Sequence, residues 1–204
     1  AAPTRNEYLV GHLKARGLLD ILRYDGSTWS LLYSVAGTTY NQACNTVFGS
    51  CNQSFDIAYE QLSGKAVIMY TKDSAKVGGA DNSSIYYITW DGNVSSTESS
   101  IELKPGGDPA TAAGWIRLVP KGINLTDNRS NEILVMMLTS TPTLYAGVWD
   151  SVSNTVISTT TITNSTPTAH GRPFDAAWET VSGDAVLVFA SSTATTTTPF
   201  SYKK

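Results

Sequence analysis

Residues 55–70 read FDIAYEQLSGKAVIMY, and residues 174–189 read FDAAWETVSGDAVLVF. Both stretches fit the pattern F-D-x-A-aromatic-E-x-x-S-G-x-A-V, an agreement too long to arise by chance, so the chain contains an internal repeat. The copies begin 119 residues apart. Halfway between them, residues 115–119 and, after a polar loop, residues 131–137 form a diverged third copy.

A second landmark follows the apolar segments. An aromatic residue and an aspartate occur together at Tyr24-Asp25-Gly26, Trp90-Asp91-Gly92 and Trp149-Asp150-Ser151, with the aspartates spaced 66 and 59 residues apart. Aspartate caps a tight turn through its side chain, and glycine accepts positive φ. The sequence therefore predicts hairpin turns formed by Asp25, Gly26, Asp91, Gly92 and Asp150.

One repeat unit can be written as four short strands, such as residues 66–70, 85–90, 94–103 and 115–119. Four antiparallel strands in a repeat of roughly 60 residues are the signature of a β-propeller blade. We therefore expect an all-β fold and one repeat region over residues 1–204. Its approximate units are 6–60, 65–119, 131–179 and a partial unit at 184–204.

The chain holds about three and a half such units, whereas closed propellers have about four to eight blades. Three alternatives follow. The chain is part of a longer polypeptide, or another copy completes it by sharing strands, or the sheets stack as a β-sandwich. Unpaired strand edges template pairing with another chain, so the second alternative predicts self-association.

Composition and charge narrow the classes of partner that the chain could bind. Charged residues make up 15% of the chain and the formal net charge is -3, with Lys and Arg scattered. We therefore expect no nucleic-acid partner. The longest apolar run, residues 133–138, is strand length, so no membrane span is expected. The opening Ala1-Ala2-Pro3 is typical of a chain after signal-peptide removal, although an arbitrary boundary would look the same.

Two features favour an extracellular or cell-surface location. Cys44 and Cys51 are the two cysteines, and their spacing fits neither a zinc site nor a redox motif. A local disulfide is the better interpretation, with two buried free thiols as the alternative. Sequons for N-glycosylation occur at Asn52, Asn82, Asn93, Asn124, Asn128 and Asn164.

The F-D-x-A-aromatic-E and aromatic-Asp-Gly patterns resemble the repeats of large secreted surface proteins of bacteria and archaea, which are commonly predicted to be β-propellers. The resemblance implies fold and compartment only, because that group has no uniform activity. The segment Asp25-Gly26-Ser27-Thr28-Trp29 also looks similar to the Asp-box turn of sialidase-type propellers. It lacks the residue between Asp and Gly, and the later copies lose Thr-Trp.

No catalytic, cofactor or metal site is predicted. Neither His12 nor His170 neighbours a nucleophile motif. The carboxylate pairs Asp56 with Glu60 and Asp175 with Glu179 recur in two repeats, which indicates a structural role rather than catalysis. Residues 127–132 supply oxygens but lack a calcium-loop pattern.

Two functions remain. The leading hypothesis is a non-enzymatic extracellular structural protein, a subunit of a surface filament, sheath or layer. The alternative is a carbohydrate-binding or adhesion module that uses aromatic side chains, because rings in loops could bind glycans. A glycosidase would need carboxylates from different repeats to converge in one cleft. The aromatic residues considered for sugar stacking are Tyr24, Trp29, Tyr86, Tyr87, Trp90, Trp115, Tyr145, Trp149 and Trp178.

Overall fold

The computed structural model describes residues 1–14, 17–36, 38, 53–72, 84–103, 113–123, 131–139, 143–163, 173–190 and 200–204. Within these ranges the chain forms fourteen β-strands and no helix. The strands make four antiparallel sheets of three, four, four and three strands. The described part of the chain accordingly contains no helix that could cross a membrane. The all-β architecture of repeated antiparallel sheets agrees with the prediction.

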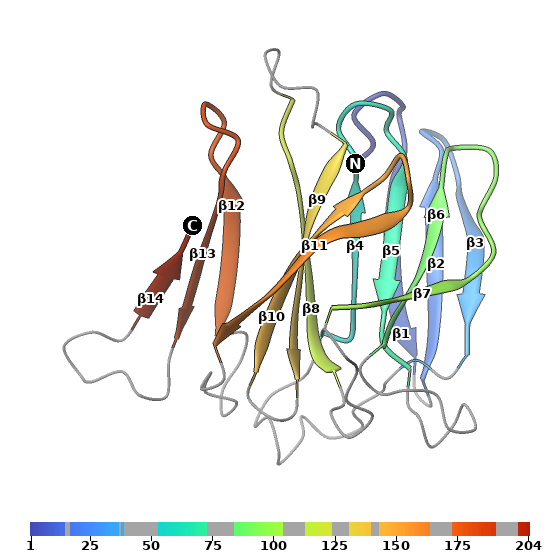
Figure 1. The fold of residues 1–204 in the computed structure, drawn as a ribbon. Coiled ribbons are helices and arrows are strands. Elements are labelled where there is room, and N and C mark those ends of the chain that lie inside the picture. The colour runs from blue at the N-terminus through green and yellow to red at the C-terminus, as the bar shows by residue number, and fades with distance from the viewer. Residues whose placement is uncertain are drawn as a thin grey trace.

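Each sheet uses its strands in chain order, so neighbours in sequence are neighbours in space (Figure 1). The first sheet consists of β1 (Tyr8–Lys14), β2 (Leu18–Tyr24) and β3 (Trp29–Val35). The second consists of β4 (Phe55–Tyr59), β5 (Ala66–Tyr70), β6 (Ser84–Trp90) and β7 (Ser99–Glu102). The third consists of β8 (Ala113–Pro120), β9 (Glu132–Thr139), β10 (Leu144–Asp150) and β11 (Thr155–Thr163). The fourth consists of β12 (Phe174–Trp178), β13 (Ala185–Ala190) and β14 (Phe200–Lys203).

Three hydrophobic cores lie between consecutive sheets. Alternate residues of a strand point to opposite faces, so each central sheet packs against both of its neighbours. The core between the first and second sheets includes Leu19, Ile21, Ile68, Tyr70 and Trp90. The core between the second and third sheets includes Val67, Met69, Ile133, Val135 and Trp149. The core between the third and fourth sheets includes Leu134, Met136, Phe174, Leu187 and Phe189.

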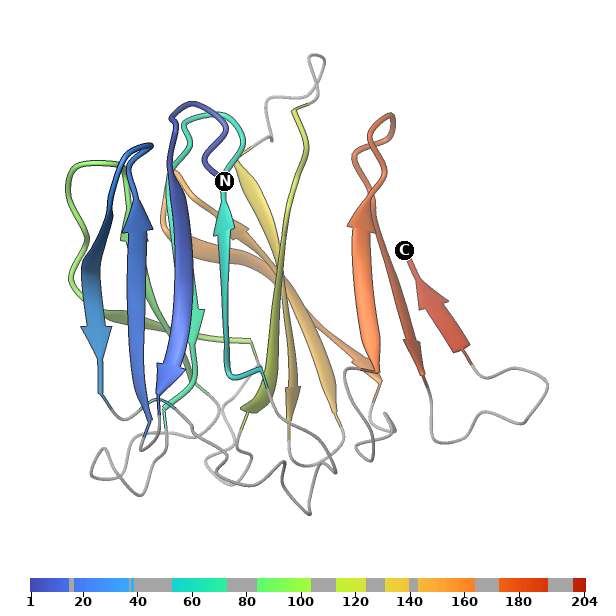
Figure 2. The same cartoon turned by 180° about the vertical axis from the view of Figure 1, so that it is seen from behind.

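The sheets converge at their first strands. β4 contacts β8, and β8 contacts β12, while β1 contacts β4. In Figure 2, seen from the side opposite to Figure 1, β1 (blue), β4 (cyan), β8 (olive) and β12 (orange) follow one another from left to right. Convergence of the first strands is the arrangement of blades around a propeller axis. The fold is therefore propeller-like, and each sheet corresponds to one blade.

The strands group differently from the repeat units written from the sequence. Residues 115–119 were expected to close the second unit, but they lie in β8, which pairs with β9 and opens the third sheet. The reason is the tight connection between β4 and β5, where the Glu60 N–H donates to Lys65 O at 2.8 Å. That connection binds the F-D-x-A-aromatic strand to the apolar strand that follows it. A structural unit therefore begins one strand earlier, at residues 55, 113 and 174.

The two outer sheets are three-stranded in different ways. The turns that contain Asp25, Asp91 and Asp150 follow β2, β6 and β10, so these three strands are equivalent. The strands that precede and pair with them, β1, β5 and β9, are therefore also equivalent. Within the described residues the first sheet thus has no counterpart of β4. The fourth sheet runs from the β4-type strand β12 to β14, and its described residues include no counterpart of β7.

Candidate functional site

The predicted turn aspartates occupy equivalent places in three sheets. The carboxylates of Asp25, Asp91 and Asp150 each accept the backbone N–H groups two and three positions later, at 2.7 to 3.2 Å. Gly26 and Gly92 adopt φ values of 97° and 102°, which a residue with a side chain rarely adopts. These aspartates therefore hold turns together.

The hydrogen bonds in the turns also favour the ionised carboxylates. The backbone N–H groups of Thr28 and Val94 are the largest cause of the lowered pKa of Asp25 and Asp91. Burial acts to raise the pKa of Asp150, but the Ser153 hydroxyl and the turn N–H groups outweigh it and lower that pKa. The carboxylate oxygens are engaged within their own turns, and the Asp150 carboxylate also accepts the Asn131 side-chain amide, which supports a structural role.

The recurring glutamates Glu60 and Glu179 also cap turns. Each carboxylate accepts the backbone N–H groups two and three positions later, including Ser63 N at 2.8 Å and Val181 N at 2.9 Å. Gly64 takes the positive φ of 75° that the first of these turns needs. Two identical arrangements in two sheets agree with the structural role expected from their repetition.

The recurring aspartates Asp56 and Asp175 link neighbouring sheets. Asp56 Oδ2 accepts the Leu118 N–H of β8 at 2.9 Å, and burial raises the pKa of this carboxyl group. Arg117 lies between the two aspartates, at 3.4 Å from Asp56 and 3.3 Å from Asp175. Asp56 therefore belongs to the contact between the second and third sheets, and Asp175 to the contact between the third and fourth sheets.

Some of the remaining predicted residues lie within the ranges that the structure describes, and others lie outside them. His12 is exposed on β1, and Asn93 is exposed in the turn after β6. No group of three or more His, Cys, Asp or Glu side chains with metal-site geometry occurs among the residues that the structure describes. Several predicted residues lie outside the described ranges: Cys44, Cys51, Asn52, Asn82, Asn124, Asn128, Asn164 and His170.

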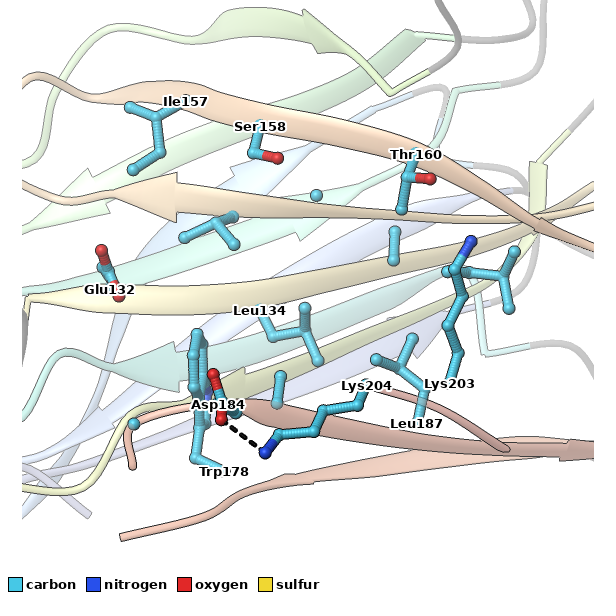
Figure 3. A pocket seen from close by; sticks show the side chains of 16 residues that line it. Glu132, Leu134, Ile157, Ser158, Thr160, Trp178, Asp184, Leu187, Lys203 and Lys204 are labelled. Carbon is cyan, nitrogen blue, oxygen red and sulfur yellow. Dashed lines mark ion pairs between the residues drawn. The ribbon is translucent and has the colours of Figure 1, made fainter. Parts of the chain in front are cut away.

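A groove of about 370 Å³ lies between the third and fourth sheets (Figure 3). One wall comes from β9, β10 and β11, and the other from β12, β13, β14 and the residues beside them. The apolar lining consists of Leu134, Ala146, Val148, Ile157, Ile162, Trp178, Ala185 and Leu187. The polar side chains of the lining are Glu132, Ser158, Thr160, Asp184, Lys203 and Lys204.

Charged groups are placed at both walls of this groove. Glu132 is buried and pairs with the buried Lys121 at 3.2 Å. Asp184 pairs with Lys204 at 2.7 Å, and the hydrogen bond from Lys204 to Asp184 is the largest cause of the raised pKa of the Lys204 ammonium. Carboxylates from both sheets and ammonium groups from the fourth sheet thus line one space.

Trp178 supplies the aromatic surface. Its indole N–H donates to Val119 O of β8 at 2.9 Å, and the Lys121 ammonium lies 5.0 Å from the ring centroid. These contacts fix the ring between the sheets, where part of it lines the groove. The site therefore combines a fixed aromatic ring with polar groups of both charges.

A second groove of about 380 Å³ lies between turns of the second and third sheets. Most of the residues that line it are polar or charged, and the full lining consists of Glu60, Leu62, Ser63, Lys65, Asp91, Asn131, Ser151 and Val152. The Lys65 ammonium donates to Asn154 Oδ1 at 2.9 Å and to Ser151 O, so it ties the two sheets together. This groove offers polar groups without an aromatic ring.

Sequence reasoning considered Trp178 for sugar stacking but assigned no role to Asp184, Lys203 or Lys204. Glu132 was part of the segment weighed for calcium. The signal that could have found Glu132 and Asp184 is the repeat itself, because Lys65, Glu132 and Asp184 occupy one equivalent position and all carry charge.

Comparisons with known proteins identify the fold alone. No family model and no curated protein matches the sequence. The NanB sialidase of Streptococcus pneumoniae is similar in structure, with a TM-score of 0.51 and 13% identity over 94% of this chain and 26% of that one. A mutant of AofleA from Arthrobotrys oligospora has a TM-score of 0.51 and 10% identity over 100% of this chain and 54% of that one. The chain thus spans about a quarter to a half of these propeller-type structures.

Proposed function

We propose that the chain is a carbohydrate-binding module whose ligand lies in the groove between the third and fourth sheets. The observation that carries the proposal is the combination of Trp178 with carboxylates and ammonium groups in one groove. Sugars present C–H faces that pack on aromatic rings and hydroxyl groups that need hydrogen-bond partners. The groove volume of about 370 Å³ falls within the range of small-molecule sites.

Of the two functions considered from the sequence, we now favour the carbohydrate-binding module, which was the alternative, over the structural subunit. The groove favours a ligand-binding module over a subunit of a filament, sheath or layer, because a purely structural subunit has no need of an open site. The similarity to a sialidase supports a fold on which carbohydrate chemistry is known to occur. It carries no further weight at 13% identity.

Binding to a glycan array followed by calorimetry tests the proposal. Thr160 is exposed on β11 and lines the groove, so Thr160→Tyr should fill part of it without disturbing a core. Thr161 is the exposed next residue and lies outside the lining, so Thr161→Tyr is the matched control. We expect the first variant to weaken binding at least about tenfold and the second to bind like the unaltered chain.

Two results would overturn the proposal. The first is that no glycan binds the unaltered chain. The second is that Thr160→Tyr binds with unchanged affinity, which would move the site elsewhere, with the polar groove at Lys65 as the next place to examine.

Glycoside hydrolysis is the second candidate, favoured by two carboxylates that line the same groove from facing sheets. Glu132 lies on β9 and Asp184 precedes β13. A pair of carboxyl groups across a bound sugar is the machinery of glycosidases. The expectation that the chain is no enzyme therefore finds no support in this site.

Turnover of chromogenic aryl glycosides by the purified chain distinguishes the two candidates. A hydrolase predicts turnover that Glu132→Gln and Asp184→Asn each remove. A binding module predicts retention of the sugar without product. Variants that still turn over substrate would exclude these two carboxylates as the catalytic pair.

We also propose an extracellular location. The Asn93 side chain is exposed in the turn after β6, where a glycosyltransferase could reach it. Intact mass of the native protein before and after enzymatic deglycosylation tests this. An unchanged mass would remove glycosylation as support.

A further inference from the structure

The fourth sheet leaves apolar side chains uncovered at positions that are buried in the third. Val188, Phe200 and Tyr202 are 44%, 67% and 78% exposed. Strand pairing makes them the repeat counterparts of Met136, Leu144 and Ala146, which are 0%, 0% and 3% exposed. In the third sheet these positions pack against the following sheet. We call Val188, Phe200 and Tyr202 the trailing face.

The first sheet shows the converse pattern on its opposite side. Tyr8 and Val10 are 48% and 45% exposed, whereas their counterparts in the third sheet, Ile133 and Val135, are fully buried against the preceding sheet. Trp29 extends the same surface at 57% exposure. We call Tyr8, Val10 and Trp29, together with Tyr24, the leading face.

The leading face is ordered by contacts between its rings. The centroids of Tyr8 and Tyr24 lie 6.2 Å apart, and those of Tyr24 and Trp29 lie 5.2 Å apart. Tyr24 is the repeat counterpart of Trp90 and Trp149, which are buried between sheets. A preformed aromatic surface loses little side-chain entropy when a partner covers it.

We propose that a second copy of this chain docks its leading face on the trailing face of the first, so that the copies associate head to tail. The two faces are the two sides of one interface that the chain already makes three times between its own sheets. The contact therefore continues an established mode of packing. It differs from strand sharing, because whole sheet faces meet and no strand changes sheets.

Such a contact is heterologous, so it either closes into a ring or continues as an open chain of copies. Two copies bring together eight sheets, which is about the upper limit of closed propellers. The proposal does not rest on the carbohydrate site, which lies between the third and fourth sheets of one copy.

Sedimentation velocity of residues 1–204 at increasing concentration tests the proposal. We expect species larger than a monomer. Trp29→Asp on the leading face and Val188→Asp on the trailing face should each raise the dissociation constant at least about tenfold. Leu62→Asp is the matched control, because Leu62 is 61% exposed in a turn away from both faces.

Mixing the two face variants separates head-to-tail from symmetric association. The Trp29→Asp chain keeps an intact trailing face, and the Val188→Asp chain keeps an intact leading face. We therefore expect each variant alone to be monomeric and the mixture to form a heterodimer. Failure of the mixture to associate would overturn the head-to-tail arrangement.

A monomer of the unaltered chain at all concentrations up to about 100 µM, where even a weak specific interface associates, would overturn the proposal. The two faces would then be covered by something other than a second copy. Association that neither face variant weakens would also overturn it. Circular dichroism of each variant separates loss of association from loss of folding.

Discussion

Glu7 and Trp90 are 83 residues apart in the chain, and they meet between the first and second sheets. The Trp90 indole N–H donates to both carboxylate oxygens of Glu7 at 3.1 Å. Glu7 is 2% exposed and also accepts hydrogen bonds from Arg5 at 3.0 Å, Arg23 at 2.9 Å and the Tyr59 hydroxyl at 3.0 Å. One buried carboxylate thus joins four donors from separate segments.

Replacement of this carboxylate should destabilise the fold. Glu7→Gln keeps one acceptor but removes the charge that Arg5 and Arg23 pair with, so we expect a loss of about 2–4 kcal/mol in the free energy of unfolding. Urea denaturation measures it. Glu102→Gln, at an exposed carboxylate on β7, should change that free energy by less than about 0.5 kcal/mol. Equal effects of the two variants would mean that the network adds nothing specific.

The same residue predicts a dependence of stability on pH. Burial acts to raise the pKa of Glu7, but hydrogen bonds from Arg5, Trp90, Tyr59 and Arg23 outweigh it, and the folded-state pKa is lowered. The contribution to stability is therefore complete above the unfolded pKa of about 4.3 and is lost as the pH falls through the lower folded value.

Urea denaturation between pH 7 and pH 3 measures this dependence. The difference in stability between the unaltered chain and Glu7→Gln should shrink on acidification. A difference that stays constant with pH would show that the charge of Glu7 is not responsible.

The turn aspartates give a third prediction. Asp91→Ala removes the acceptor for two backbone N–H groups and should cost about 0.5–2 kcal/mol, as loss of a comparable cap does. Asp91→Asn keeps a side-chain oxygen and should cost less. Thermal unfolding of the two variants distinguishes them, and an equal loss from both would indicate that charge rather than the turn hydrogen bonds is what matters.

A close approach between the first and second sheets gives a fourth prediction. A Cβ atom built on Gly11 of β1 would lie 2.2 Å from a ring carbon of Phe55 on β4. Gly11→Ala should therefore force the two sheets apart and cost about 1–3 kcal/mol. A Cβ on Gly122 would have no atom within 4 Å, so Gly122→Ala is the control. Unchanged stability of Gly11→Ala would mean that the ring moves freely aside.

The fold could be predicted from the sequence because the repeat is visible in the order of the residues alone. The F-D-x-A pattern and the aromatic-Asp turns predict sheets, hairpins and their number without knowledge of spatial contacts. The grouping of strands into sheets was wrong by one strand. Ser63-Gly64 identifies a turn, but periodicity does not say which unit the preceding strand belongs to. Backbone hydrogen bonds between β4 and β5 decide that.

The groove could not be predicted from the sequence, for a different reason. Its walls belong to two sheets, and a strand pattern does not say which face of one sheet meets which face of the next. Trp178 was recognised as aromatic, yet Glu132 lines the same groove as Trp178 only because the third sheet packs against the fourth. Lys121 was also missed, because the third copy of the repeat has diverged and Lys121 replaces the glutamate of the F-D-x-A-aromatic-E motif.

That replacement leads to the last prediction. Lys121 and Glu132 form a buried pair, whereas the equivalent positions in the second sheet hold Glu60 and Lys65. Lys121→Glu would place two carboxylates together in a buried site, so we expect a loss of about 3–5 kcal/mol.

The charge-swapped double variant, Lys121→Glu with Glu132→Lys, restores opposite charges and should recover at least about half of that loss. Recovery should stop short of the original stability, because the introduced carboxylate cannot replace the Lys121 ammonium over the Trp178 ring. A double-mutant cycle measured by urea denaturation gives the coupling energy. Additive effects of the two substitutions would show that this pair does not stabilise the fold through its charges.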